Sequence, residues 1–277
     1  MGITARIIDD TPHAAAFNMA ADLHLLAACE SGPAVFVRIY TWEKPSITLG
    51  TMEKPGETLD MAVLNQHGAE WIRRATGGRS VLHHYDITYS CIFSNGAPGM
   101  GAALMDTYRV VSDCLIAGLG HTGIRCSRHD SPLDNSLLKS GAKLPCFLSP
   151  NRHEIMASGK KLVGSAQKRT AKAVLQHGSI PLTPAFRNLP DYLRIDEKER
   201  EIQKRLLVQK CICISEIVPE IKEATFRECL IKGFCETLPC PASMSAWTPE
   251  EQKTITAIAE SNDFLRRWQS WPYHVDR

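Results

Sequence analysis

The stretch HEIMASGKKLVGSAQKRTAKAVLQHGSIPL, residues 153–182, decides the fold. Ser158-Gly159 is a pair typical of a two-residue hairpin turn, and runs with apolar and β-branched residues flank it. A second turn is expected near residues 170–172. The stretch therefore predicts a meander of three strands.

Apolar spacing extends this prediction outward from the meander. Further strands are expected at 34–42, 46–50, 69–74 and 86–93, and helices at 14–29, 58–67, 102–119, 197–207, 223–238 and 249–260. Residues 127–145 are polar and are expected to form a loop. The pattern predicts one α+β domain over 1–277, with a mixed or antiparallel β-sheet flanked by helices and a helical C-terminal part at about 197–277.

Composition excludes several classes of protein. Of the 277 residues, 44% are hydrophobic and 22% charged, as in ordinary globular proteins. The net charge of +2 gives no strong field for nucleic acid, and no apolar run is long enough for a membrane helix. The N-terminus has acids and a proline where a signal peptide would be apolar. We therefore expect a cytoplasmic protein, with its 10 cysteines reduced.

The segment RRATGGRSVLHH, residues 73–84, concentrates charge and glycine between two expected strands, which predicts a loop. Gly77-Gly78 permits positive φ and close approach of a ligand, and Arg73 and Arg74 are side chains that bind phosphate or carboxylate. No Walker or Rossmann pattern follows. The segment is thus either an anion-binding loop or a plain hairpin with solvated arginines.

A second segment, GKKLVGSAQKR, residues 159–169, places lysine beside small residues. Lys160 and Lys161 point to opposite faces of the expected strand, so at most one faces a pocket. Small residues at 164–166 allow a ligand chain to lie against the backbone. The alternative is an exposed hairpin lysine.

The cysteines offer two further possibilities. Cys146 lies on an expected loop edge upstream of Lys161, where the two could form a thiol–lysine pair; most cysteines, however, are inert small hydrophobes. Cys211 and Cys213 form the only close pair, and no second pair completes a four-ligand zinc site. A non-catalytic thiol- or metal-binding protein stays possible. His177, on an expected strand, reads as a hydrogen-bonded core histidine.

Together these segments resemble the biotin/lipoyl protein ligase and transferase superfamily. The resemblance covers about 14–240 and is carried by residues 73–83, 161–167 and 175–180, with support from Asn18-Met19-Ala20, Trp42, Pro45 and Gly50. It is greatest to the octanoyltransferase branch of the LipM type, because Arg79 follows the paired glycines and a Cys-Phe pair precedes GKKLVGSAQ. The resemblance implies a biotin/lipoyl protein ligase-like catalytic domain.

The resemblance also implies an activity: transfer of an octanoyl group from acyl carrier protein to a lysine of a lipoyl domain, such as the glycine-cleavage H protein or a dehydrogenase E2 subunit, in lipoate biosynthesis. It implies Cys146 as nucleophile and Lys161 as its partner, in a monomer that needs neither cofactor nor metal. The arginines of the Gly-Gly segment are expected to meet the phosphopantetheine of the carrier or an acidic face of the acceptor. Substrate contacts are expected from Arg73, Arg74, Gly77, Gly78, Arg79, Ser80, His83, Val163, Gly164, Ser165, Ala166, His177 and Gly178.

Two other activities of the superfamily stay open. An ATP-dependent lipoate–protein ligase would use the same loop and Lys161 to bind lipoyl-adenylate, and an amidotransferase would move the acyl group between lipoyl domains. Departures from the family pattern bear on the donor and the acceptor more than on the fold: His84 stands where Asp is common, and Thr51-Met52-Glu53 and residues 151–154 are unusual.

Overall fold

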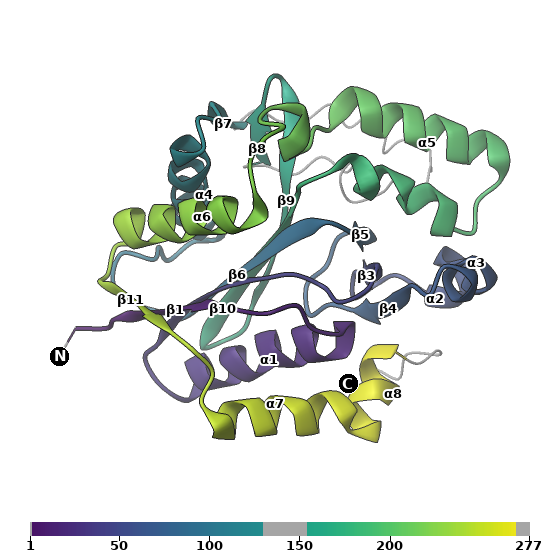
Figure 1. Ribbon diagram of the computed structural model, residues 1–277. Helices are drawn as coiled ribbons and strands as arrows, with labels where there is room; N and C mark the ends of the chain where they lie inside the picture. The colour runs from purple at the N-terminus through teal and green to yellow at the C-terminus, as the bar shows by residue number, and fades with distance from the viewer. Residues whose placement is uncertain (1, 130–153, 270–277) are drawn as a thin grey trace.

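The large β-sheet organises the molecule. A computed structural model of the chain describes residues 2–129 and 154–269 (Figure 1). The sheet has the strand order β11-β1-β2-β6-β10-β9-β8-β7. The β11–β1 and β1–β2 pairs are parallel and the others antiparallel, so the sheet is mixed. The strands are β1 (Ala5–Asp9), β2 (Val35–Tyr40), β6 (Asp86–Ser94), β7 (Cys126–His129), β8 (Glu154–Ala157), β9 (Lys160–Arg169), β10 (Ala173–Pro181) and β11 (Ala242–Ser245).

A smaller sheet carries the Gly-Gly segment. It contains β3 (Ser46–Leu49), β4 (Glu70–Arg73) and β5 (Val81–His83), in the order β4-β3-β5. Strand β3 runs parallel to β4 and antiparallel to β5. The expectation of a loop throughout 73–84 is therefore wrong at 81–83, because Val81 and Leu82 are buried apolar residues that pair with β3. We call residues 74–80 the Gly-Gly loop.

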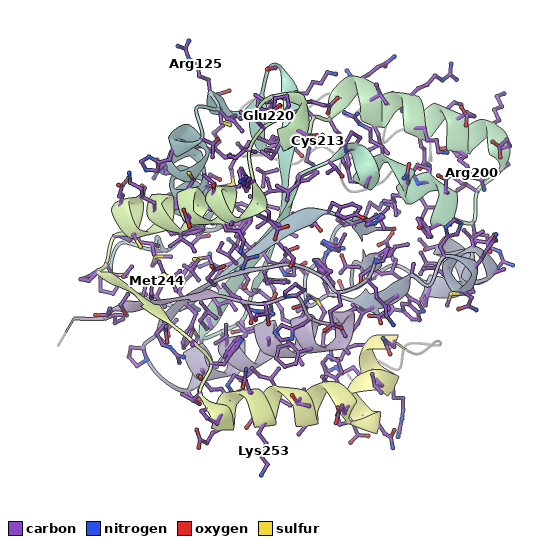
Figure 2. The ribbon with its side chains drawn as sticks, in the orientation of Figure 1. Arg125, Arg200, Cys213, Glu220, Met244 and Lys253 are labelled. Atoms are coloured by element: carbon purple, nitrogen blue, oxygen red, sulfur yellow. The ribbon has the colours of Figure 1, made fainter. Side chains whose placement is uncertain are left out.

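Helices cover both faces of the large sheet (Figure 1). On one face α1 (Ala15–Ser31) packs against α7 (Pro249–Glu260), which leads into α8 (Asn262–Gln269). On the other face α4 (Leu104–His121) packs against α6 (Glu223–Thr237). The shorter elements α2 (Pro55–Thr58), α3 (Met61–Gln66), η3 (Pro184–Tyr192), α5 (Glu197–Lys210) and η4 (Ile214–Glu216) complete the fold. Figure 2 shows Lys253 pointing from α7 into solvent, away from the core.

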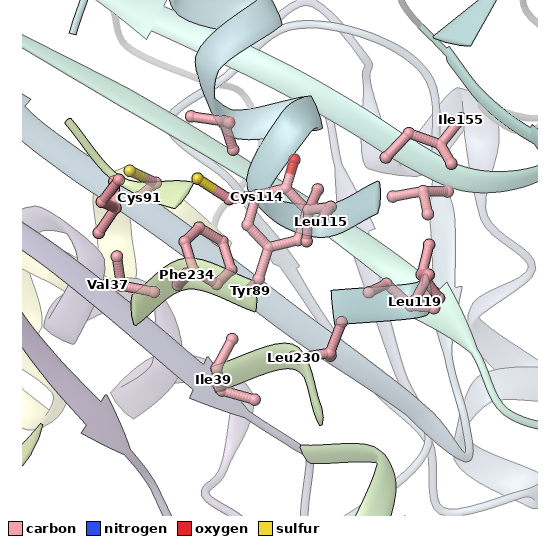
Figure 3. Packing of buried hydrophobic residues seen from close by; sticks show 14 of the residues in the cluster. Val37, Ile39, Tyr89, Cys91, Cys114, Leu115, Leu119, Ile155, Leu230 and Phe234 are labelled. Carbon is pink, nitrogen blue, oxygen red and sulfur yellow. The ribbon is translucent and has the colours of Figure 1, made fainter. Parts of the chain in front are cut away.

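Strand alternation divides the core in two. Tyr89 and Cys91 of β6 face α4 and α6, where they meet Leu115 and Phe234 (Figure 3). Ile92, between Cys91 and Phe93, belongs to the cluster on the α1 side. Helices α4 and α6 cross closely, because a Cβ on Gly233 would lie 2.2 Å from the backbone nitrogen of Gly118.

Local signals in the sequence proved reliable. The Ser158-Gly159 turn is confirmed, with φ of 51° and 73°, and so is the three-strand meander β8-β9-β10. The expected helices and strands all have counterparts. Strands β1 and β11 and helix α8 were not predicted, and residues 127–129 belong to β7, where a loop was expected. Of the helices in the described ranges, none combines the length and the apolar character needed to cross a membrane.

Candidate active site

A central cavity lies where the small sheet meets β9 and β10. It encloses about 360 Å³ of empty space including its mouth. Apolar side chains and strand backbone form much of its wall. The lining residues are Met19, Tyr40, Trp42, Thr48, Arg74, Val81, His83, Thr88, Gly164, Ser165, Ala166, His177, Gly178 and Ser179.

Arg74 holds the Gly-Gly loop in shape from within. Its Nη2 donates to the carbonyl oxygens of Gly77 (2.7 Å) and Arg79 (2.9 Å). Its Nε donates to Oγ1 of Thr76 at 3.0 Å, and its Nη1 donates to the carbonyl of Thr48 in β3 at 3.1 Å. One guanidinium thus closes the loop on itself and fastens it to the small sheet.

The Gly-Gly loop also rests on the turn after β3. A Cβ on Gly50 would lie 2.0 Å from the carbonyl oxygen of Gly78, so only glycine fits there. Glu53 joins the two segments, since its carboxylate accepts from the backbone N–H of Gly50 (2.9 Å) and from Oγ of Ser80 (2.8 Å). Sequence reasoning treated Glu53 only as a departure from the family pattern and missed this contact.

Burial of the first two arginines changes their role. Arg73 and Arg74 are 1% and 4% exposed, and Nη1 of Arg73 donates to the carbonyl of Glu53. Both guanidinium groups are thus turned toward backbone carbonyls and away from the protein surface, and their expected contact with the carrier or the acceptor stays a prediction. Arg79 is exposed and lines a second hollow with Lys54 and Gly78.

His177 connects the loop to the floor of the cavity. Its Nε2 lies 2.8 Å from Oγ1 of Thr76, and its Nδ1 lies 3.1 Å from Oδ2 of Asp22 on α1. Burial lowers the pKa of His177, and the neighbouring Asp22 carboxylate opposes that effect. The expectation of a hydrogen-bonded histidine on a strand is confirmed.

Below His177 lies a buried ionic network that orients Asp22. Arg38 is fully buried and lies 3.5 Å from Oδ1 of Asp22. It donates to Oδ2 of Asp10 at 2.7 Å and to Oδ1 of Asn18 at 2.6 Å. A buried charge needs such partners, so the network fixes α1 against the sheet beneath the cavity.

His83 occupies the opposite wall of the cavity. Its ring stacks on Trp42 with 4.1 Å between centroids. Its Nδ1 lies 2.8 Å from Oδ2 of Asp86 and its Nε2 lies 2.9 Å from Oγ1 of Thr48. The indole N–H of Trp42 donates to Oγ1 of Thr88 at 2.8 Å. These bonds hold two ring faces rigidly beside the cavity.

Lys161 is buried on β9, the strand that also supplies Gly164 to the cavity wall. It is 3% exposed, and its Nζ lies 2.5 Å from Oε1 of Glu154 on β8. Its carbonyl accepts from the backbone N–H of Ile212, which brings Cys211 alongside. Lys160 points the other way and donates to the carbonyl of Val208, so the two lysines do face opposite sides.

Burial lowers the acidity of eight of the described thiols. It raises the pKa of Cys211 to about 12 even though Lys161 works in the opposite direction. Burial also raises the pKa of seven further cysteines, Cys29, Cys91, Cys114, Cys126, Cys213, Cys235 and Cys240. Such thiols are poor nucleophiles at neutral pH. Within residues 2–129 and 154–269, no group of three or more His, Cys, Asp or Glu side chains could hold a metal ion.

The predicted site residues fall into distinct places. Cys146 lies outside the described residues. Val163 points into the core on the α4–α6 side, away from the cavity, because it alternates with Gly164. Lys161, Arg73 and Ser80 lie outside the cavity lining, and Gly77, Gly78 and Arg79 are exposed. The cavity brings together Arg74, His83, Gly164, Ser165, Ala166, His177 and Gly178.

Several lining residues were not proposed from the sequence as site residues. Thr48, Val81, Thr88 and Ser179 reach the cavity because their strands flank it. Met19, Trp42, Val81 and Ser179 could have been found, since all four lie in stretches that carry the family resemblance. Tyr40 has no such signal.

The comparisons with known proteins agree with this geometry. Residues 14–235 match the family model of the lipoyl protein ligase A/B catalytic domain, and the chain belongs to that family. Within it, the chain is LipM-like. Octanoyltransferase LipM of Kyrpidia tusciae is 33% identical over 260 residues, covering 92% of this chain and 94% of the relative. Octanoyltransferase LipM of Bacillus anthracis is 36% identical over 262 residues, covering 91% and 93%.

Solved structures show the same fold at lower identity. A lipoate-protein ligase A bound with ATP superposes with a TM-score of 0.74 at 20% identity, covering 93% of this chain and 95% of that one. A bipartite lipoate protein ligase from Thermoplasma acidophilum, described with its E2 lipoyl domain, gives 0.76 at 18% identity, covering 95% and 96%. The predicted superfamily, α+β fold and acyltransferase class are therefore confirmed.

Proposed function

We propose that this octanoyltransferase moves an octanoyl group from octanoyl-acyl carrier protein to a lysine of a lipoyl-domain protein, through a thioester on Cys146. The observation that carries the activity is the extended similarity to proteins named Octanoyltransferase LipM. The central cavity supports it, because its walls of aromatic rings, Met19 and strand backbone suit an apolar chain that ends in a polar carbonyl.

Two observations support Cys146 as the nucleophile. Burial raises the pKa of eight described cysteines, and that of Cys211, the thiol beside Lys161, rises to about 12. Lys161 is a buried cation on the strand that forms the cavity wall, and a nearby cation favours a thiolate. Cys146 is the thiol that the family resemblance pairs with Lys161.

The chemistry needs no external energy source, because the donor thioester is already activated. In the first step the Cys146 thiolate attacks the octanoyl carbonyl, a new C–S bond forms, and the carrier thiolate leaves. In the second step the neutral amine of the acceptor lysine attacks, the C–N bond forms, and the bond to Cys146 breaks. The amine loses one proton and the carrier thiolate gains one, so charge and atoms balance overall.

The test is intact mass after mixing the protein with octanoyl-acyl carrier protein in the absence of ATP. We expect an octanoyl adduct on the wild type that hydroxylamine removes. Cys146→Ser should form none, whereas Cys235→Ser, a matched change at an exposed thiol, should form it normally. An unmodified wild type that attaches lipoate to a lipoyl domain only when ATP is added would refute the thioester route and favour a ligase.

A further inference from the structure

We propose that a groove on the far side of the His83–Trp42 stack receives the acceptor lysine and that Asp86 binds its amine. This inference rests on the proposed function. The groove is lined by three carboxylates, Glu43, Asp86 and Glu223, and encloses about 700 Å³ of empty space including its mouth. We call it the acidic groove.

The acidic groove and the central cavity share a wall. Trp42 and His83 line both, so the groove and the cavity adjoin at this stacked ring pair. Separate access suits a two-substrate reaction, because the acceptor can then approach while the acyl chain stays in place. The acidic groove thus adjoins the site already described.

Asp86 has a buried acceptor without a donor. Asp86 is 3% exposed. Its Oδ2 accepts from Oγ of Ser179 at 2.6 Å and from Oγ1 of Thr88 at 3.2 Å, and Nδ1 of His83 lies 2.8 Å from the same oxygen. No hydrogen-bond donor in the described part of the chain reaches its other oxygen, Oδ1. A buried carboxylate oxygen is costly to leave unsatisfied. A lysine amine, with its N–H donors, would satisfy it.

The rim of the groove suits a positively charged segment of a protein. Glu43 and Glu223 are exposed. The one lysine of the groove, Lys44, lies 3.5 Å from Glu70, and Glu223 lies 3.9 Å from Nη1 of Arg227, so both of these charges are partly offset. Tyr85 is 66% exposed, its φ is +55°, and its ring stacks on His84. An exposed aromatic held in a strained conformation beside carboxylates is a suitable anchor for a lysine-bearing loop.

The test separates the two half-reactions. The octanoyl-enzyme is first formed from octanoyl-acyl carrier protein and is then mixed with either an unmodified lipoyl domain or Nα-acetyl-lysine amide. Asp86→Asn keeps the side-chain shape but removes the charge. We expect Asp86→Asn to slow transfer to both acceptors by about 10- to 100-fold more than it slows formation of the octanoyl-enzyme, a step it affects only through the Asp86–His83 contact. Glu250→Gln, an exposed change on α7, should match the wild type in both steps.

A second variant guards against a folding defect at the buried position. Glu43→Gln/Glu223→Gln changes only exposed side chains. It should slow transfer to the lipoyl domain, remove much of the salt dependence of that step, and leave transfer to the small lysine unchanged.

The outcomes distinguish this inference from the function on which it rests. If the octanoyl-enzyme forms and Asp86→Asn passes the group on at the wild-type rate, the acidic groove is refuted while the transferase stands. If Asp86→Asn does not fold, the double variant decides. A Glu43→Gln/Glu223→Gln protein that transfers to the lipoyl domain at the wild-type rate, with the wild-type salt dependence, would refute the acidic groove. A wild type that forms no octanoyl-enzyme would overturn the proposed function itself, and this inference with it.

Discussion

Oγ1 of Thr76 and Nε2 of His177 lie 2.8 Å apart, which ties the Gly-Gly loop to the central strand β10. The two residues are 101 positions apart in the chain. Because His177 also contacts Asp22 of α1, the loop, the sheet and the first helix meet at one imidazole ring. The shape of the cavity therefore depends on contacts between distant segments, and the predictions below probe them.

Arg74→Lys should destabilise the protein by about 1–3 kcal/mol, because lysine cannot reach both loop carbonyls and buried acceptors lose their donors. The loosened loop should also lower the rate of octanoyl transfer by about 100-fold. Urea unfolding and single-turnover transfer measure the two effects. Arg79→Lys, an exposed change in the same loop, should leave stability within about 0.5 kcal/mol of wild type. Equal stability of both variants would show that Arg74 does not hold the loop.

Gly50→Ala should cost about 1–3 kcal/mol of stability, because its Cβ would lie 2.0 Å from the carbonyl oxygen of Gly78. Gly77→Ala is the matched comparison, since nothing lies within 4 Å of the added carbon. Thermal unfolding of the two variants compares them directly. A Gly50→Ala protein that melts with the wild type would mean that the Gly-Gly loop has room to shift.

Acidification should weaken the fold through His177. Burial lowers its folded-state pKa below the unfolded value of about 6.5, so below that pH the unfolded state binds more protons. Stability from this residue is thus present above about pH 6.5 and is lost as the pH falls toward the folded pKa. Urea unfolding at pH 7.5 and 5.5 should show a smaller difference in His177→Gln than in the wild type. His67→Gln, at an exposed position, should keep the wild-type difference.

Lys161→Ala should slow formation of the octanoyl adduct by about 100-fold, if Lys161 stabilises a thiolate and the developing oxyanion. It should also shift the pH profile of iodoacetamide alkylation at Cys146 upward, because loss of the cation disfavours the thiolate. Lys160→Ala, on the opposite face of the strand, should change neither. An unshifted alkylation profile in Lys161→Ala would assign Lys161 a structural role beside Glu154 instead.

Elements with strong local signals could be predicted, and elements that depend on distant partners could not. The hairpin at 158–159 follows from its turn residues, and α1 from its apolar spacing. Strand β11, with the sequence ASMS, has little strand propensity and exists because it pairs with β1. Its pairing partner, β1, lies more than 200 residues earlier in the sequence, so no local pattern could predict the strand.

The same limit applies to the site. The sequence identified the Gly-Gly segment, His83, His177 and residues 164–166, which the structure brings to one region. It could not show that Arg73 and Arg74 are buried, since an arginine run reads equally as solvated or ligand-facing until the nearby carbonyls are known. Asp86 was missed for a related reason: an orphaned carboxylate oxygen is visible only in three dimensions.

The parallel pairing of β11 with β1 has a consequence for synthesis of the protein. Strand β1 can pair with β2 soon after both are made, but its other edge meets β11 only after residues 242–245 have been made. Until then β1 presents unpaired backbone groups, the kind of edge on which other chains can add. Synthesis of β11, rather than any local event, is what covers this edge of β1.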